Sequence, residues 1–246
     1  MNANIEDWEE FEQEVKEVCE TYHAAAENEK QGIHTVSVDE KTGIQALERE
    51  AETKPMIPGF VEKREYNYER HGTTCLFGNL NVATGKMIAP MLNATRTEVD
   101  FVKNIENIIA TAPNAGWVIV LDHLNTHQSE SLVILVARLL GITTDLGVKG
   151  KSGVLKSLKS RKAFLTDKSH RIRFVFTPKH CSWLNQIEIW FSGLTRRVLT
   201  RGNFRSVEEL KTKIRDYIEF YNKNAKPFQW KYKPKTTVPK IGTNGI

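Results

Sequence analysis

The chain has 246 residues, of which 40% are hydrophobic and 26% charged, a composition typical of a globular domain. No apolar run approaches the roughly 18 residues of a membrane-spanning helix, so we expect no membrane partner. Cys19, Cys75 and Cys181 form no CxxC pair and are odd in number, and the acidic residues 1–30 show no export signal. These features favour the reducing cytoplasm over secretion.

The net charge of +5 is unevenly distributed. Residues 1–30 contain ten Asp or Glu and two Lys, a local balance of −8, so residues 31–246 carry +13. A body this basic favours a polyanionic partner such as nucleic acid, although a solvated basic surface would have the same composition.

An amphipathic helix is predicted near the N-terminus. Between Ile5 and Tyr22 the apolar residues recur in steps of three and four, the period of one helical face. Gln31-Gly32 ends the helix, so residues 1–31 form a helix and linker before the main domain. The apolar stripe either packs on the body of the protein or joins two copies of the chain.

A strand and a hairpin follow. Ile33–Val38 alternates as a half-buried strand and delivers Asp39 at its C-terminal end. Thr73–Leu80 and Lys86–Leu92 read as two strands joined by the turn Asn81–Gly85, in which Gly85 supplies a positive φ angle.

The central part of the chain predicts helix, strand and helix. Thr97 is a suitable N-cap for the first helix. Its expected buried stripe consists of Val99, Val102, Ile105 and Ile109. Trp117–Leu121 is continuously apolar, as in a strand covered on both faces, and Asp122 follows it. Ser129–Leu140 is the next helix.

After an insertion at residues 143–170, the pattern returns to strand and helices. Arg173–Thr177 is predicted to be a strand, and Ser182 to cap the helix that carries Glu188. Ser206 and Glu209 form a capping-box pattern for a last helix, and residues 227–246 read as a basic tail. The mixed order of strands and helices predicts an α/β fold.

Three acids stand at the ends or inner faces of these elements: Asp39, Asp122 and Glu188. If the two strands are neighbours, Asp39 and Asp122 meet at one sheet edge, and Glu188 can reach inward from its helix. Converging carboxylates suit hard divalent ions, and two such ions catalyse phosphodiester cleavage. Simpler interpretations stay open, namely a turn residue for Asp39, a helix cap for Asp122 and a salt bridge for Glu188.

Two longer motifs strengthen the catalytic interpretation. Val120-Leu-Asp-His-Leu-Asn-Thr-His127 and Thr177-Pro-Lys-His-Cys-Ser-Trp-Leu-Asn-Gln-Ile-Glu-Ile-Trp-Phe191 resemble the DDE transposases of the mariner superfamily. The bacterial insertion-sequence branch called six-thirty is the most similar. Val38-Asp-Glu-Lys-Thr-Gly43 looks like its first acidic motif, and Arg201-Gly-Asn-Phe204 and Pro227-Phe-Gln-Trp230 resemble its C-terminal pattern.

The resemblance implies an RNase H-like mixed sheet flanked by helices, formed by residues 32–226. It implies that Asp39, Asp122 and Glu188 are catalytic and bind two Mg²⁺ or Mn²⁺ ions. The expected activity is cut-and-paste transposition: hydrolysis at element ends, then strand transfer into target DNA. The expected partners are double-stranded DNA and a second copy of the chain, in the nucleoid of a bacterial cytoplasm.

The chain departs from the family pattern at three points. His123 replaces the Asn that commonly follows the second acid. The separation of the second and third acids is 188 minus 122, or 66 positions, longer than usual because of residues 143–170. No helix-turn-helix precedes Asp39, so we expect the chain to be one product of a split or truncated frame, with a separately encoded helix-turn-helix half.

Exposed cations are candidates for contact with DNA phosphates. We expect the insertion to hang over the cleft through which DNA passes, because both of its ends join active-site elements. The full set of candidates is Lys149, Lys151, Lys156, Lys159, Arg161, Arg196, Arg197 and Arg201. A solvated loop is the simpler interpretation of the insertion.

Two other motifs are rejected. Gly150-Lys-Ser resembles the end of a P-loop, but Asp145 stands where that motif requires Gly. A zinc site built from His123, His127, His180 and Cys181 lacks recognised ligand spacing, so hydrogen-bonded histidines are expected.

Two functional alternatives remain open. One is an RNase H-like DNA endonuclease without strand transfer. The other is a decayed transposase that only binds DNA, against which the presence of all three acids argues.

Overall fold

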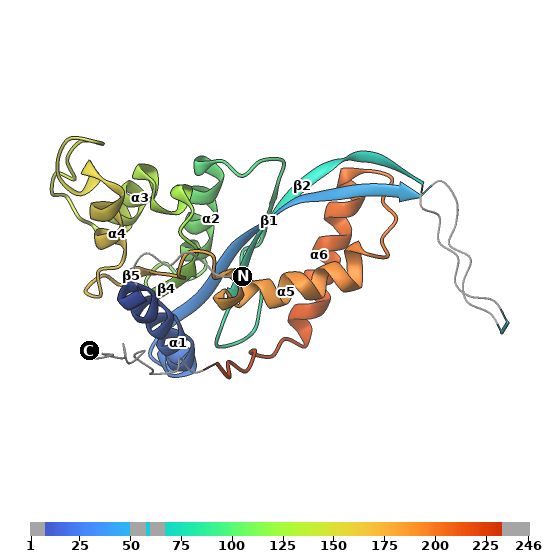
Figure 1. The fold of residues 1–246 in the computed structure, drawn as a ribbon, viewed down its shortest axis with the longest axis horizontal. Helices are drawn as coiled ribbons and strands as arrows, with labels where there is room; N and C mark the ends of the chain where they lie inside the picture. Colours follow the sequence, from blue (N-terminus) through green and yellow to red (C-terminus); the bar gives the residue numbers. More distant parts are fainter. Residues whose placement is uncertain (1–7, 50–57, 60–66, 233–246) are drawn as a thin grey trace, which may run out of the picture.

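The computed structural model describes residues 8–49, 58–59 and 67–232 (Figure 1). A five-stranded mixed sheet has the order β3-β2-β1-β4-β5. The strands are β1 (Ile33–Arg49), β2 (Tyr68–Asn81), β3 (Met91–Asn93), β4 (Gly116–Leu121) and β5 (Ile172–Phe176). β1 pairs antiparallel with β2 and parallel with β4, and β5 extends the parallel part.

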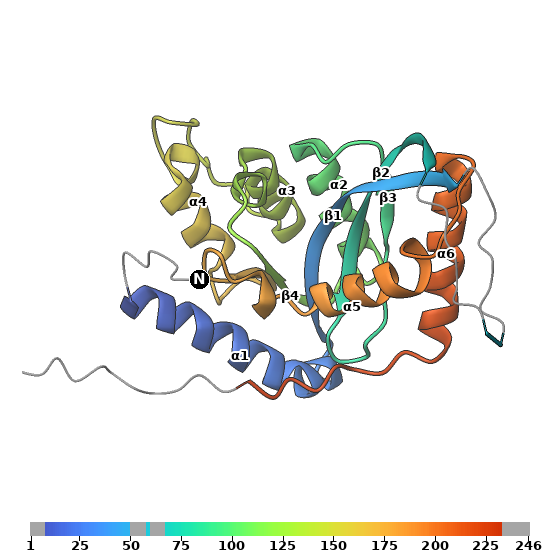
Figure 2. The same ribbon diagram turned by 45° about the vertical axis from the view of Figure 1, so that its right-hand side comes forward.

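Helices cover both faces of the sheet (Figures 1 and 2). On one face lie α2 (Glu98–Ala110), α3 (Glu130–Leu140) and α4 (Leu158–Leu165). On the other lie α1 (Trp8–Lys30), α5 (Ile187–Leu194) and α6 (Val207–Lys223). The short helical turns are η1 (Asn125–Gln128), η2 (Val154–Lys156), η3 (Ser182–Leu184) and the π-helix η4 (Thr195–Leu199).

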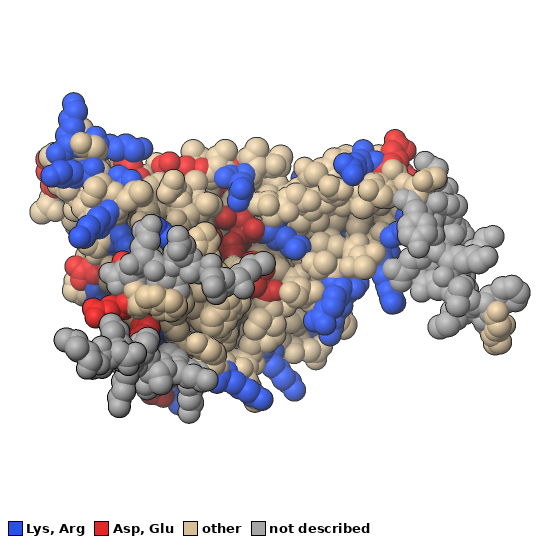
Figure 3. Space-filling view, viewed as in Figure 1, with Lys and Arg blue, Asp and Glu red and all other residues tan. Residues whose placement is uncertain are grey.

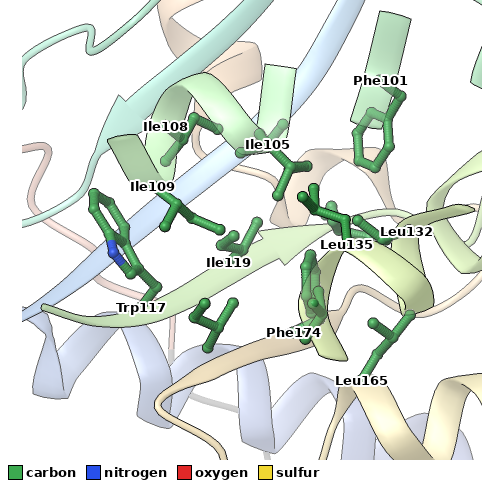
Figure 4. Packing of buried hydrophobic residues seen from close by; sticks show 14 of the residues in the cluster. Phe101, Ile105, Ile108, Ile109, Trp117, Ile119, Leu132, Leu135, Leu165 and Phe174 are labelled. Atoms are coloured by element: carbon green, nitrogen blue, oxygen red, sulfur yellow. The ribbon is translucent and has the colours of Figure 1, made fainter. Parts of the chain in front are cut away.

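The largest core lies between the sheet and α2, α3 and α4 (Figure 4). Trp117 and Ile119 of β4 and Phe174 of β5 meet the α2 residues Ile105 and Ile109 there, and all five are at most 2% exposed. Val118, Val120 and Val175 point to the opposite face, where they pack on α1. The continuous apolar run of β4 is therefore explained by burial on both sides.

The N-terminal helix packs on the body of the protein. Val15, Val18, Tyr22 and Ala25 of α1 are buried against the sheet, in agreement with the first of the two predicted uses of its apolar stripe. Ile5 lies outside the described residues, and Trp8 is exposed. No helix in the described part of the chain is long and apolar enough to cross a membrane. The three cysteines are buried and unpaired.

Several predicted elements have the expected caps. Thr97 accepts a hydrogen bond from the backbone N–H of Asp100 and forms a full capping box at α2. Ser129 and Ser206 cap α3 and α6. Gly85 has a φ of 73° in the turn after β2. The second strand of that hairpin was predicted too long, because it is reduced to one bridge at Met87 and the short β3.

Three other predictions about these elements were wrong. Val99 was expected in the buried stripe of α2 but is 74% exposed, because the buried face of the helix contains Phe101 and Ile108 instead. Ser182 begins η3 and caps no α-helix; α5 starts five residues later, at Ile187. Asp39 is not at a strand end, since β1 continues to Arg49.

The insertion is a small packed lobe rather than a loose loop. It lies beside α3, at the end of the molecule remote from the long β1–β2 hairpin (Figure 1). Leu155 and Leu165 join the largest core, and Arg161 is 8% exposed. Arg161 Nε donates to Gln128 O at 2.7 Å and its Nη1 to Leu155 O at 3.1 Å. Arg161 therefore joins the lobe to η1. The prediction that it is a surface cation in contact with DNA was wrong, because its guanidinium is buried and hydrogen-bonded to Gln128 and Leu155.

Candidate active site

The sheet brings the first two acids together. Ser37 of β1 pairs in register with Val120 of β4, so Asp39 lies two residues beyond that pair and Asp122 lies directly after β4. Because β1 and β4 are parallel, both acids lie at the C-terminal end of the segment over which the two strands pair. The continuation of β1 pairs with β2 alone, where Asp39 faces Gly78.

A hydrogen-bonded asparagine joins the third acid to the first. Asn185, two residues before α5, is fully buried. Its Nδ2 donates to Val38 O at 2.9 Å and to Asp39 Oδ2 at 3.2 Å. Ser37 Oγ donates to Asn185 Oδ1 and accepts from the backbone N–H of Ile187 at 2.9 Å. The start of α5, and with it Glu188, is thereby attached to β1.

The close approach of α5 requires a glycine on β2. A Cβ atom at Gly78 would lie 2.7 Å from the ring of Phe191, which is shorter than real Cβ contacts. Phe191 therefore occupies the space of the missing side chain opposite Asp39, and α5 packs directly on the strands that carry the site.

The acids crowd one another electrostatically. Burial, the largest cause, and then the charges of Asp122, Glu40 and Glu188 together raise the pKa of Asp39 to about 7, against a hydrogen bond from the Glu40 backbone that lowers it. Figure 3 shows acidic side chains gathered over the middle of the molecule, with Lys or Arg beside them. The site is therefore a concentration of negative charge that favours a cationic ligand.

A buried histidine organises two of the neighbouring carboxylates. His127 Nδ1 lies 2.7 Å from Asp122 Oδ1, and Nε2 lies 3.1 Å from Glu40 Oε1. Burial lowers the pKa of His127, but hydrogen bonds to Asp122 and Glu40 outweigh it and raise the value to about 9. Burial acts to raise the pKa of Asp122, yet the bond from His127 holds it below its ordinary range. His127 is therefore a hydrogen-bonded histidine, as predicted, that orients Asp122.

Helix α1 contacts the segments that carry the second and third acids. The buried Tyr22 hydroxyl donates to Leu184 O at 2.9 Å and accepts from the Gln186 backbone N–H at 3.3 Å. Glu14 lies about two turns before Tyr22 on the same helix. Its Oε1 lies 3.0 Å from His123 Nε2, and Lys162 donates to the same oxygen at 2.7 Å. The histidine that departs from the family pattern is thus the partner of a glutamate on α1.

The remaining predicted cations lie at two ends of the molecule. Lys149, Lys151, Lys156 and Lys159 are exposed on the insertion lobe, where Figure 3 shows Lys and Arg gathered at the upper left. Of these, Lys149 lies 3.5 Å from Glu130. Arg196, Arg197 and Arg201 are exposed on and after η4, which continues α5.

A second group of possible metal ligands lies away from the triad. The ligand atoms of Glu48, Glu69 and His71 all lie within 4.8 Å of one another on the β1–β2 hairpin. His71 and Arg205 already pair with Glu48. Among the described residues no other group of three approaches this closely, so the triad carboxylates share one region but stand farther apart.

Sequence reasoning missed several residues of this site. Glu40, Asn185, Ser37 and Tyr22 were assigned no role. Lys41 lies two residues after Asp39 and therefore on the same strand face, 5.8 Å from the Phe191 ring. Asn185 lay inside a motif already quoted, so its position was a usable signal.

Comparison with known proteins gives a consistent result. Residues 34–211 match the family described as DDE superfamily endonuclease. The Mos1 transposase paired-end complex with left transposon end superposes with a TM-score of 0.53 at 13% identity, covering 91% of this chain and 60% of that one. The Mos1 mariner paired end complex with Mn gives 0.49 at 13% identity, covering 86% and 58%.

The isolated catalytic domain of Mos1 mariner transposase gives a TM-score of 0.46 at 11% identity, with 86% of each chain covered. The chain thus spans about three fifths of the Mos1 chains in the two complexes. No curated protein gives a significant match. The mixed five-stranded sheet flanked by helices is the RNase H-like fold of the Mos1 catalytic domain, as the sequence predicted.

Proposed function

Because the chain belongs to the DDE superfamily endonuclease family, we propose that it is the catalytic part of a DNA transposase. It hydrolyses phosphodiester bonds at element ends and joins the freed 3′ ends to target DNA. The main support is that Asp39, Asp122 and Glu188 come from distant parts of the chain to one region, where the charges of the other two raise the pKa of Asp39.

The donor set fits divalent metal ions. The triad offers oxygen ligands only, which suits Mg²⁺ or Mn²⁺. The raised pKa of Asp39 reflects burial and crowded negative charge, which a divalent cation would offset. Two bound ions would supply activation of the attacking water or hydroxyl and charge relief for the leaving oxygen.

The protein's own groups have distinct tasks in this scheme. Asp39, Asp122 and Glu188 would hold the divalent ions through their carboxylate oxygens. Asn185 holds the Asp39 carboxylate through its Nδ2, and His127 holds that of Asp122 through its Nδ1. The two strands and α5 keep the three carboxylates in place while the DNA is exchanged.

The proposed partners follow from the same function. Double-stranded DNA is the substrate, both as element end and as target, and Lys149, Lys151, Lys156 and Lys159 are exposed for contact with it. We place the chain in the bacterial six-thirty branch, acting in the cytoplasm at the nucleoid. A homodimer on DNA and a separately encoded helix-turn-helix half complete the proposal.

Metal dependence provides the direct test. The protein is incubated with a supercoiled plasmid and a labelled duplex with free 3′ ends, in Mg²⁺, Mn²⁺, Ca²⁺ or EDTA. We expect plasmid nicking and transfer of label to the plasmid in Mg²⁺ and Mn²⁺. Neither product should form in EDTA or in Ca²⁺, whose looser coordination spoils in-line geometry.

The outcomes separate the alternatives. Nicking without transfer of label would favour an endonuclease that lacks strand transfer. Binding of the duplex with no product in any divalent ion would favour a remnant that only binds DNA. Full nicking in EDTA would contradict a metal mechanism.

Removing the Tyr22 hydroxyl tests whether α1 positions the catalytic residues. Tyr22→Phe leaves Leu184 O and the Gln186 N–H without their buried partner, which costs about 1–3 kcal/mol of stability. Because these groups flank Asn185, we expect single-turnover cleavage to fall about tenfold, which is about 1.4 kcal/mol in activation free energy. The apparent affinity for DNA should be unchanged.

Tyr221→Phe is the matched control, since this tyrosine lies partly buried on α6 and its hydroxyl makes no hydrogen bond within the described residues. Both rates are measured well below the melting temperature of each variant. Equal cleavage rates for the two variants would reduce Tyr22 to a purely structural residue.

A further inference from the structure

A concave basic surface lies beyond α5, at the side of the site opposite the insertion lobe. It has a volume of about 320 Å³ and lies between η4, the loop after it and α6. Its lining includes Arg197, Arg201 and Lys213, together with Asn203 and Phe204. We call it the basic pocket.

The cations of the basic pocket are uncompensated. No acidic residue lines it, and Arg197, Arg201 and Lys213 have no ion-pair or hydrogen-bond partner anywhere in the part of the chain that the structure describes. In contrast, Lys162 and Lys149 both pair with carboxylates. Three like charges around one hollow repel one another, and an anion bound between them would relieve that repulsion.

The wall of the pocket is fixed to the sheet. Phe204 is 3% exposed, and its backbone N–H donates to Leu47 O at 2.8 Å. The Arg49 N–H donates to Asn203 Oδ1 at 2.6 Å. At Gly202 a Cβ atom would lie 2.1 Å from the Phe204 ring, so only glycine permits this tight loop. The loop that forms this wall of the pocket is therefore held in place by β1.

Its position relative to the triad is set by one continuous helix. α5 runs directly into η4, where Thr200 N–H donates to Thr195 O at 2.8 Å in the wide π-helical pattern. Such π-turns occur frequently at functional sites. From Glu188 to Arg197 is nine residues, or about 14 Å along a helix axis. That is the axial rise of about four nucleotides of one DNA strand.

We propose that the basic pocket binds a backbone phosphate of duplex DNA, about four nucleotides from the phosphodiester held at the triad. This inference rests on the proposed function in taking DNA as the polyanion. It assigns Lys213, on α6, to DNA contact together with Arg197 and Arg201. The protein would then contact the DNA strand at a second place, on the side of the triad away from the insertion lobe.

The salt dependence of binding tests the proposal without any cleavage. The triple variant Arg197→Gln, Arg201→Gln, Lys213→Gln is compared with the parent by fluorescence anisotropy, using a labelled duplex in EDTA over a series of salt concentrations. Each lost phosphate contact removes about 0.9 from the slope of log affinity against log salt. We therefore expect weaker binding and a slope flatter by about two to three.

A matched variant separates the pocket from net charge. Lys30→Gln, Lys103→Gln, Lys168→Gln removes the same three charges from exposed positions that pair with Glu27, Glu106 and Glu17. Its slope should stay within about one of the parent value.

The outcomes distinguish this inference from the function on which it rests. A parent that binds DNA with a slope unaffected by the pocket variant would overturn the basic pocket, whether or not the parent cleaves. An equal change in both triple variants would overturn it too. A pocket-dependent slope in a parent that never cleaves would support the pocket and contradict the proposed catalysis. A parent with no affinity for DNA would overturn both.

Discussion

Changing any one of Asp39, Asp122 or Glu188 to its amide should lower the rate of Mg²⁺-dependent DNA cleavage at least about a thousandfold. The amide keeps the shape of the side chain and one oxygen ligand but removes the negative charge that holds the ion. A thousandfold loss corresponds to about 4 kcal/mol of activation free energy, within the several kcal/mol that metal ions contribute to phosphoryl transfer. The three effects should not add, because each variant disables the same centre.

The measurement is single-turnover nicking of supercoiled plasmid, with DNA affinity measured separately in EDTA. Affinity should be retained, since the triad contributes no positive charge. Asp145→Asn, an exposed acid on the insertion lobe, is the control and should cleave at the parent rate. If one of the three amide variants nicked DNA within tenfold of the parent, that residue would be removed from the triad.

Without metal, Asp39→Asn should make the protein more stable at neutral and alkaline pH. The pKa of Asp39 is raised from 3.8 to about 7, mainly by burial and then by Asp122, Glu40 and Glu188. Each tenfold change in an acid constant is worth about 1.4 kcal/mol, so ionised Asp39 destabilises the fold by at most roughly 4 kcal/mol. The amide loses one hydrogen bond to Asn185, about 1 kcal/mol, which leaves a net gain of roughly 1–3 kcal/mol.

The sign of the pH dependence follows from the direction of the shift. Between pH 3.8 and about 7 the unfolded chain has released the Asp39 proton while the folded chain retains it, so parent stability falls as pH rises. The stability difference between Asp39→Asn and the parent should therefore be small at pH 4 and full at pH 8. Urea unfolding in EDTA at both pH values measures it, with Asp216→Asn, an exposed acid on α6, as control.

Metal should reverse the order of the two proteins. A divalent ion that binds only the folded parent stabilises it in proportion to the logarithm of its concentration, whereas the variant binds it weakly. Millimolar Mg²⁺ at pH 8 should thus raise the melting temperature of the parent and leave that of Asp39→Asn nearly unchanged. A parent more stable than its variant at pH 8 in EDTA would show that the acids do not crowd one another.

The parts of the fold that sequence predicted well are those with local causes. Trp117–Leu121 is apolar throughout because both faces of β4 are buried, and Thr97 and Ser206 cap helices through contacts three residues away. The length of β1 was not predicted because Glu40–Gly43 reads as a polar turn. In the structure this stretch continues beside β2 through register shifts, with Gly43 at a φ of 62°.

The residues that position the triad were not predicted, because they contact residues that are far away in the sequence. His127 reaches Glu40 across 87 positions, and Tyr22 reaches Leu184 across 162. Periodicity reports which face of an element is buried but not which element covers it. The three acids themselves were predicted from strand position and family resemblance, and the motif around Glu188 also contains Asn185. The contacts of Asn185 and Tyr22 depend on α5 and α1 lying on the same face of the sheet, which the sequence does not give.

The attachment of α5 through Asn185 determines when the candidate site can form during synthesis of the chain. Ser37 and Asn185 are 148 positions apart, so their contact forms only after most of the chain has left the ribosome. Contacts of such long range are slow to form, and domains assemble as units during synthesis. A nascent chain that contains both Asp39 and Asp122 must grow by 66 further residues, 188 minus 122, before it contains Glu188. The three acids can therefore come together only after Glu188 has been made and α5 has docked on β1 through Asn185.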